Sequence, residues 1–307
     1  MARNNFFVKT GSYTGNGADD RSITGLGFRP QFVIVKGSNV AAAFRIDKMA
    51  INSSGFLNAT ADVADAIQEF LSDGFQVGTH SSVNTNAVTY YWMAFAGFAG
   101  QSYFRAFTYV GSGVDNRNLT GLGLNFTPNV VAVKQTGAVA GVCRTSSMGA
   151  DNSFQFSNSA DATNQIQSLI SNGVQLGSST SANGNTTSYW GFAFKALSGI
   201  IAVGTYTGNG VDDRAITGVG FQPGFIIAKS AAATGSAVLK PSSLAGDSSL
   251  FAGTASASSN VIQSLDADGF TIGTDNGINQ NGTAYWWIAF KEGSFQLPLS
   301  RTTTTRS

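Results

Sequence analysis

The sequence predicts an all-β protein made of three tandem β-sandwich repeats of a jelly-roll-like type. One stretch occurs three times, as Tyr13–Phe32 (YTGNGADDRSITGLGFRPQF), Tyr109–Val130 (YVGSGVDNRNLTGLGLNFTPNV) and Tyr206–Phe225 (YTGNGVDDRAITGVGFQPGF). Short β-branched and aromatic runs, separated by glycine-rich turns, follow in the same order in each copy. The copies begin about a hundred residues apart, which is the length of a domain and not of a solenoid repeat.

The landmarks after this stretch also repeat. Each copy has an apolar run that ends in lysine and later an aromatic run, with a basic residue between them at Arg45, Arg144 and Lys240. The apolar runs are Phe32–Lys36, Val130–Lys134 and Phe225–Lys229, and the aromatic runs are Tyr90–Phe95, Tyr189–Lys195 and Tyr285–Lys291. These landmarks place the repeats at residues 1–98, 99–197 and 198–296, followed by an extended C-terminal tail at 297–307.

The first copy shows why each element is expected. Phe6–Tyr13 is rich in β-branched and aromatic residues and predicts a strand that runs into a glycine turn. A short strand follows at Asp20–Thr24. Phe32–Lys36 is apolar almost throughout, which is typical of a central strand covered on both faces. Phe44–Ile46 is expected to be its neighbour, across a loop of small residues at 37–43.

Two interpretations compete for the next region. Residues 61–71 have helical periodicity, but the equivalent stretches at 161–170 and 256–266 are rich in serine or asparagine. A β-hairpin turning at Ser72–Gly74 fits all three copies better than a helix. A polar loop then leads to the aromatic closing strand, which is a second candidate for the centre of the sheet.

Glycines mark the turn before the central strand in every copy. Gly25, Gly121 and Gly218 occupy the same position, where the chain has to bend sharply after a short strand. We expect each of them to adopt a conformation that a side chain disfavours.

Two arrangements of the repeats are open. Three homologous repeats in one chain can take the place of the three subunits of a trimer and close into a pseudo-threefold ring. Closed symmetry is the common arrangement among soluble oligomers. The alternative is a linear string. The joints at 97–102 and 196–199 are short, so the last strand of one copy has to lie near the first strand of the next.

Composition excludes several classes of function. Charged residues make up 11% of the chain and the formal net charge is +1, so there is no concentrated basic face for nucleic acid or for an anionic membrane. Cys143 is the single cysteine, which excludes an intrachain disulfide framework. No apolar stretch is long enough to span a bilayer.

The residues offer no catalytic, metal or cofactor site. His80 is the single histidine and is matched by serine and aspartate in the other copies, while Cys143 is matched by apolar residues. The acidic pair Asp19-Asp20 is not kept as a pair in the middle copy, which has Asp115-Asn116. We therefore expect a protein that is not an enzyme and that holds no cofactor.

Six residues are candidates for interactions. Three arginines follow the acidic turn, Arg21, Arg117 and Arg214, and either lock that turn to an aspartate, form ion pairs between repeats or contact a partner. The aromatic closing strands either belong to the core or line a groove for sugar, and the core is favoured because the runs are almost continuously apolar. The candidates for a sugar platform are the members expected to face outward, Trp92, Trp190 and Trp286.

The combination of motifs resembles a repeat domain of virion proteins in tailed bacteriophages, found in tail fibres and in surface or decoration proteins. The residues that carry it are the Y-T-G-N-G stretch, the D-G-F turn at Asp73–Phe75 and the closing strand that ends A-F-K. The resemblance covers about residues 6–296. The middle copy departs from it at Ser112, at Asn116 and in the two-residue insertion Leu124-Asn125.

The resemblance implies a non-enzymatic structural protein of a phage particle, most simply one that decorates the outside of the capsid. No adaptor or shaft is visible ahead of the first repeat, which favours this interpretation. The expected partner is the major capsid protein, and the expected location is the virion, assembled in the host cytoplasm. The alternative is a tail-fibre or receptor-binding protein that recognises a glycan of the host surface.

Overall fold

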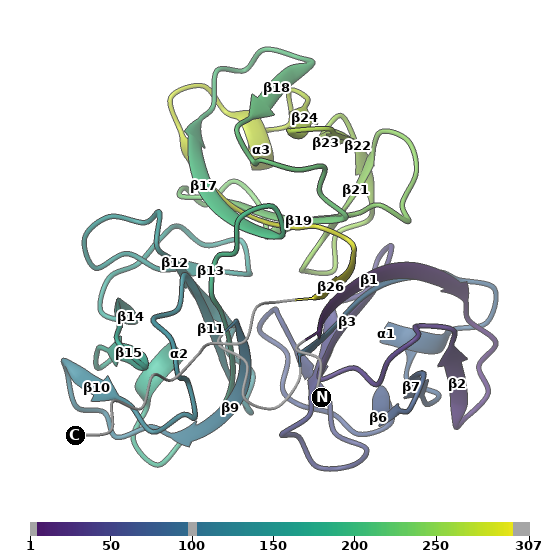
Figure 1. Cartoon of the computed structure of the whole chain (residues 1–307), viewed down its shortest axis with the longest axis horizontal. Coiled ribbons are helices and arrows are strands. Elements are labelled where there is room, and N and C mark those ends of the chain that lie inside the picture. The colour runs from purple at the N-terminus through teal and green to yellow at the C-terminus, as the bar shows by residue number, and fades with distance from the viewer. Residues whose placement is uncertain (1–4, 98–102, 297–307) are drawn as a thin grey trace, which may run out of the picture.

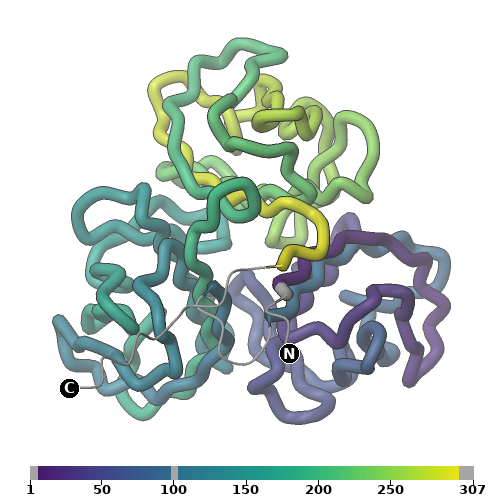
Figure 2. The backbone as a smooth tube through the Cα atoms, viewed as in Figure 1, coloured from purple at the N-terminus to yellow at the C-terminus, as the bar shows by residue number. Residues whose placement is uncertain are grey.

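Three lobes lie around a common centre in the computed structural model, which describes residues 5–97 and 103–296 (Figure 1). The chain passes through the lobes in order, and its last described segment returns to the first lobe (Figure 2). The repeats therefore form a ring and not a string. The tail expected at 297–307 and most of the first joint, 98–102, lie outside the described residues.

Each lobe contains a large antiparallel sheet and a three-stranded sheet. In the first lobe the large sheet has the order β26-β1-β8-β3-β4-β5 and the small one β2-β7-β6. Their strands are β1 (Asn5–Thr14), β2 (Arg21–Thr24), β3 (Phe32–Gly37), β4 (Ala43–Ile46), β5 (Gly55–Phe56), β6 (Ile67–Leu71), β7 (Gly74–Val77), β8 (Thr89–Gly97) and β26 (Gly293–Gln296). The β-sandwich prediction is thus confirmed.

The other two lobes repeat this topology, with the orders β13-β12-β11-β16-β9 and β17-β25-β19-β20-β21-β22 for the large sheets and β10-β15-β14 and β18-β24-β23 for the small ones. The middle lobe contains β9 (Phe104–Val110), β10 (Arg117–Leu119), β11 (Val130–Gln135), β12 (Val142–Thr145), β13 (Phe154–Gln155), β14 (Ile166–Ile170), β15 (Gly173–Leu176) and β16 (Ser188–Phe194). The third contains β17 (Ile201–Thr207), β18 (Arg214–Thr217), β19 (Phe225–Ser230), β20 (Val238–Pro241), β21 (Ser248–Phe251), β22 (Ser258–Ser259), β23 (Ile262–Asp266), β24 (Gly269–Ile272) and β25 (Ala284–Phe290).

The large sheet is buried on both faces, as the apolar run of β3 predicts. Phe32 and Ile34 point into a core that all three lobes share. Val33 and Val35 point the other way, into the core between the two sheets of the first lobe. Because side chains alternate along a strand, one apolar strand serves both cores. Its predicted neighbour is confirmed as β4.

The hairpin is also confirmed, since β6 and β7 are antiparallel and Leu71 lies opposite Gly74. The polar loop that follows contains one element that the sequence did not predict. It forms a single helical turn in each lobe, as α1 (Ser81–Asn84), α2 (Thr180–Asn183) and α3 (Asn276–Asn279). A segment of four residues is too short for helical periodicity to be visible in the sequence.

The turn glycines have the conformation expected of them. The φ angles of Gly25, Gly121 and Gly218 are +87°, +76° and +85°. In the third lobe the carboxylate of Asp268 accepts hydrogen bonds from the backbone N–H groups of Gly218 (3.1 Å) and Gly220 (2.6 Å). One carboxylate thus binds the backbone of both glycines and holds the turn in place.

The end of the predicted third repeat, at residue 296, takes part in a contact between lobes. β26 pairs with β1 and so joins the large sheet of the first lobe. The exposed edge of β1 offers unpaired backbone groups, and a strand from the far end of the chain satisfies them. This pairing joins the two ends of the described chain.

Candidate functional site

The centre of the molecule is closed by a ring of backbone hydrogen bonds. Each lobe contributes two residues, at positions that are equivalent from lobe to lobe. The backbone N–H of each residue donates to the backbone carbonyl of the next residue in the ring. The bonds run from Ala42 to Ala252, Ala252 to Ala237, Ala237 to Phe156, Phe156 to Gly141, Gly141 to Leu57 and Leu57 to Ala42, with N···O distances of 2.8–3.0 Å. The ring is complete only when all three lobes are present, so the pseudo-threefold arrangement is built into the backbone.

Three phenylalanines from equivalent positions meet at the centre of the shared core. Phe95, Phe194 and Phe290 are each about 1% exposed or less. Their ring centroids are 5.1 Å apart for Phe95 and Phe194, 5.0 Å for Phe194 and Phe290, and 4.7 Å for Phe290 and Phe95. These distances are typical of tilted and edge-to-face aromatic pairs. The lobes therefore share one hydrophobic core.

A tryptophan and an aspartate join neighbouring lobes at two of the three seams. The indole N–H of Trp286 donates to the carboxylate of Asp161 at 2.6 Å, and Trp190 donates to Asp62 in the same way. Burial raises the pKa of both carboxyls, while the tryptophan bond and a nearby lysine lower it. Each carboxylate thus has a donor from the next lobe and a cation close by.

The third seam, between the third and first lobes, differs from the other two. Tyr91 stands where the others have tryptophan and Ala257 where they have aspartate, so neither partner of the bond is present. Lys36, the equivalent of Lys134 and Lys229, therefore lacks the carboxylate that raises the pKa of those two lysines. Burial lowers the pKa of Lys36 to about 7, against about 8 for the other two.

A different contact holds the third seam together. The carboxylate of Glu292 accepts hydrogen bonds from the backbone N–H of Thr10 (3.0 Å) and the hydroxyl of Ser242 (2.8 Å). The hydroxyls of Thr10 and Ser242 are 2.8 Å apart. Together with the pairing of β26 and β1, this network takes the place of the tryptophan–aspartate bond.

The three predicted arginines are the first residues of β2, β10 and β18, at the outer ends of the three lobes (Figure 1). Arg21, Arg117 and Arg214 donate to the carbonyls of Thr14, Val110 and Thr207, at the ends of the first strands. Arg21 also lies over the ring of Tyr13 and Arg214 over that of Tyr206. Among the described residues none of the three forms an ion pair, so the predicted lock to aspartate and the predicted ion pair between repeats are both wrong, and the arginines bind backbone carbonyls instead.

The expectation for the tryptophans is wrong for Trp92. Its side chain is 6% exposed and packs in the core of the first lobe, where Gly11 makes room for the indole. Its equivalent in the third lobe is Trp287, packed in the same way against Gly204, and not Trp286. A shift of one residue along a strand moves a side chain to the other face. Trp190 and Trp286 are partly buried in the seams, so none of the three is an exposed sugar platform.

Sequence reasoning missed a set of buried asparagines that organise the loops. Asn84, Asn183 and Asn279 are completely buried, one at the end of each short helix. The amide of Asn183 donates to the carbonyls of Val114 and Gly177, both at 2.8 Å, and its oxygen accepts from Ser112 N and Arg117. The alignment of the three copies shows this asparagine in each, which is the signal that could have revealed it.

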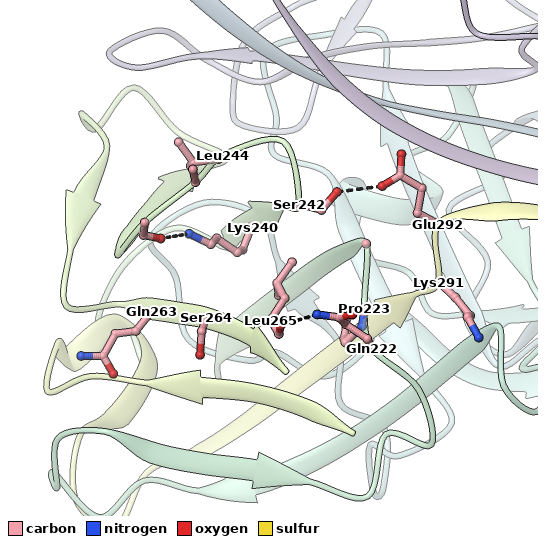
Figure 3. A pocket seen from close by; sticks show the side chains of 13 residues that line it. Gln222, Pro223, Lys240, Ser242, Leu244, Gln263, Ser264, Leu265, Lys291 and Glu292 are labelled. Carbon is pink, nitrogen blue, oxygen red and sulfur yellow. Dashed lines mark hydrogen bonds between the residues drawn. The ribbon is translucent and has the colours of Figure 1, made fainter. Parts of the chain in front are cut away.

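A cavity of about 580 Å³ lies in the third lobe beside the seam with the first (Figure 3). Its walls combine two lysines, a glutamate, two glutamines, serines and apolar side chains. Lining residues include Gln222, Pro223, Lys240, Ser242, Leu244, Gln263, Ser264, Leu265, Lys291 and Glu292. Its size is within the range of small-molecule sites.

The remaining reactive side chains have structural roles. The imidazole Nδ1 of His80 accepts from the backbone N–H of Ser82 and caps α1, as Ser179 and Asp275 cap the other two short helices. Cys143 is buried, and burial raises the pKa of its thiol. Within the described ranges no group of three or more histidine, cysteine or acidic residues could hold a metal ion.

Comparison with known families places the chain. A model described as "Domain of unknown function (DUF7483)" matches residues 1–98 and 198–297, which together are more than half of the chain. The chain belongs to the DUF7483 family. The two DUF7483 matches coincide with the first and third repeats, and the middle copy, which has the insertion at Leu124-Asn125, lies outside both. No curated protein matches the chain. No helix of the described part is long and apolar enough to cross a membrane.

Proposed function

We propose that this DUF7483 protein is a non-enzymatic structural protein of a tailed phage particle that decorates the outside of the capsid. It would bind where three subunits of the major capsid protein meet. The observation that carries the proposal is the ring of six backbone hydrogen bonds around the pseudo-threefold centre. The resemblance of the repeats to those of phage virion proteins supplies the biological setting.

A threefold site on a capsid presents the same surface three times. One chain with three near-equivalent lobes can make three equivalent contacts with such a site in one binding event. A trimer of separate subunits would first have to assemble, whereas the lobes here are already linked by a covalent chain. The shared core and the backbone ring hold the lobes in fixed positions, which lowers the entropy lost on binding.

The sequence composition supports a contact that does not depend on charge. Only 11% of the residues are charged, and the formal net charge is +1. Exposed charge pairs contribute little and weaken with salt, whereas polar and apolar contacts between matched surfaces do not depend strongly on ionic strength. A decoration protein bound through such contacts would therefore stay on the particle when the ionic strength of the solution changes.

The experiment is immunogold labelling of purified particles, followed by cryo-electron microscopy of the same preparation. Gold on the heads, with three-lobed density at sites of local threefold symmetry and one chain for every three capsid subunits, would support the proposal. Particles that contain no copy of the chain would refute it. Labelling confined to the tail would also refute decoration and would support the receptor-binding alternative, whose glycan platform can no longer rest on the buried tryptophans.

A further inference from the structure

One loop has the same shape in all three lobes. It joins β1 to β2, β9 to β10 and β17 to β18, and we call its three copies, at residues 15–20, 111–116 and 208–213, the tip loops. The φ angles of its third residue are +69°, +70° and +69°, at Gly17, Gly113 and Gly210. Those of its last residue are +54°, +55° and +53°, at Asp20, Asn116 and Asp213. Aspartate and asparagine adopt such angles only where the surrounding structure imposes them.

The buried asparagine of each lobe imposes this shape. In the middle lobe the backbone carbonyl of Asn183 accepts a hydrogen bond from Gly113 N (2.7 Å), its side-chain oxygen accepts one from Ser112 N (3.0 Å), and its amide donates to the carbonyl of Val114 (2.8 Å). Asn84 and Asn279 make the same three bonds in the other lobes, at 2.7–3.0 Å. The backbone of each tip loop is thus fixed in the free protein, so binding through it loses little conformational entropy.

The tip loops present apolar side chains to solvent. Among the described residues four large apolar side chains are exposed, and three of them lie in or beside a tip loop. Val114 and Val211 occupy the same position and are 61% and 58% exposed, and Val110, at the end of β9, is 55% exposed. The first lobe has the smaller Ala18 at the position of Val114. Single exposed apolar residues are common on proteins, whereas these recur at one position of the repeat.

The tip loops are placed for contact with a partner of threefold symmetry. The strands that follow them, β2, β10 and β18, lie at the outer ends of the three lobes (Figure 1). Because the backbone ring relates the lobes by a pseudo-threefold axis, the equivalent loops lie at the same distance from this axis and at the same height along it. A partner with the same axis meets all three loops in the same way. Three contacts on one rigid molecule bind more tightly than one, because the second and third form within an existing complex.

Charge distinguishes the middle tip loop from the other two. Together with the arginine that follows it, the middle loop is neutral, because it contains Asp115 and Asn116, whereas the other loops contain two aspartates and carry one net negative charge each. The carboxylate of Asp115 also accepts a hydrogen bond from Gln167, within its own lobe, at 3.0 Å. The middle loop, with Val110 and Val114, is therefore the most apolar of the three and the least charged.

We propose that the three tip loops are the surface through which the chain binds a partner of threefold symmetry, and that each loop enters an uncharged, apolar socket of this partner. The inference rests on the proposed function, in which the sockets belong to three subunits of the major capsid protein around one axis. The middle loop contributes most, through Val110 and Val114. The third loop contributes less, through Val211, and the first loop least, through Ala18.

The test is co-sedimentation of the purified full chain with phage heads that lack it. The triple variant A18D/V114D/V211D should bind about a hundredfold more weakly than the wild type, because a carboxylate in an apolar socket loses its hydration. Val114→Asp alone should weaken binding about tenfold, Val211→Asp less and Ala18→Asp least. Ile51→Asp is the control, because Ile51 is 78% exposed but is matched by Ala150 and Gly246 in the other lobes, and it should bind as the wild type does.

Hydroxyl-radical footprinting of the bound wild-type chain needs no variant. Oxidation of Val110, Val114 and Val211 should fall on the heads, while that of Ile51 should not change. Valines that stay reactive on the heads would overturn the inference and leave the proposed function standing, and so would a triple variant that binds as tightly as the wild type.

The remaining outcomes separate the possible partners. A loss confined to Val114→Asp would overturn the threefold contact. Self-association of the free chain in sedimentation velocity, abolished in the triple variant, would show that the tip loops bind a second copy of the chain and would also overturn the inference. A wild-type chain that does not bind the heads would refute the proposed function, and the inference with it.

Discussion

Truncation of one central phenylalanine tests whether the three lobes are a single cooperative unit. Replacement of a buried phenylalanine by alanine in a well-packed core costs about 3–5 kcal/mol. Phe194 contacts Phe95 and Phe290, one in each of the other lobes, at centroid distances of 5.1 and 5.0 Å. Aromatic pairs contribute about 0.5–1.5 kcal/mol each beyond the area they bury, so about 1–3 kcal/mol of the loss belongs to contacts between lobes.

Phe194→Ala should therefore lower the stability of the whole molecule. In urea we expect one transition, coincident by tryptophan fluorescence and far-UV circular dichroism, with a midpoint below that of the wild type. The slope of free energy against urea scales with the surface exposed, so it should be about three times that of a single hundred-residue domain. Phe95→Ala and Phe290→Ala should give losses of similar size, because the three rings are equivalent.

Hydrogen exchange gives the sharper readout. Phe194→Ala should speed exchange in β8 and β25 as well as in its own strand β16. Ile51→Ala, at a side chain 78% exposed, is the control and should change stability by less than about 0.5 kcal/mol. Separate transitions, or faster exchange restricted to the middle lobe, would contradict the idea of a shared core.

Three further predictions follow from individual contacts. Gly218→Val should destabilise the fold by about 1–3 kcal/mol in thermal melts, because the φ angle of Gly218 is +85°. The space around Gly218 is open, so backbone strain and not a steric clash is the main cost. An unchanged melting temperature would exclude the turn assignment. Asn183→Ala leaves two carbonyls without their donor and should cost about 2–4 kcal/mol in urea unfolding, whereas a loss below about 0.5 kcal/mol would contradict the clamp. The lowered pKa of Lys36 means that the folded state prefers the neutral amine, so stability should rise from about pH 7 toward the ordinary lysine pKa of 10.5. The double variant Ala257→Asp/Tyr91→Trp restores the missing pair and should raise that pKa to about 8, the value for Lys134 and Lys229, which moves the rise in stability about one pH unit higher. A pH profile identical to that of the wild type would refute this account of the seam.

The repeat pattern made the fold of one lobe predictable. The apolar run at Phe32–Lys36 predicted a strand buried on both faces, and the turn glycines predicted positive φ angles, because both properties depend on residues close together in the chain. Comparison of the copies also rejected a helix at residues 61–71 in favour of the hairpin. The one-turn helices were missed because four residues carry no periodic signal.

The candidate sites depended on register and on contacts between distant segments. Trp92 and Trp286 both lie in the aromatic runs that close their repeats. When the strands are superposed, Trp286 falls one residue away from the position of Trp92, so the two side chains lie on opposite faces of their sheets. The cavity beside Lys240 requires a comparison of side-chain volumes in space. A sequence alignment shows that Arg45 and Phe70 become a lysine and a leucine in the third lobe, but not that these two positions face each other.

The sequence by itself determined that the chain contains three copies of a β-sandwich with little charge. Whether these copies form a string or a ring was decided only by the tertiary structure. The backbone bond from Ala42 to Ala252 and the pairing of β26 with β1 join the first and third copies, which are separated by about two hundred residues of chain. Local patterns determine strands and turns, whereas closure depends on whether surfaces from different copies fit together, and that property appears only when the lobes are placed in space.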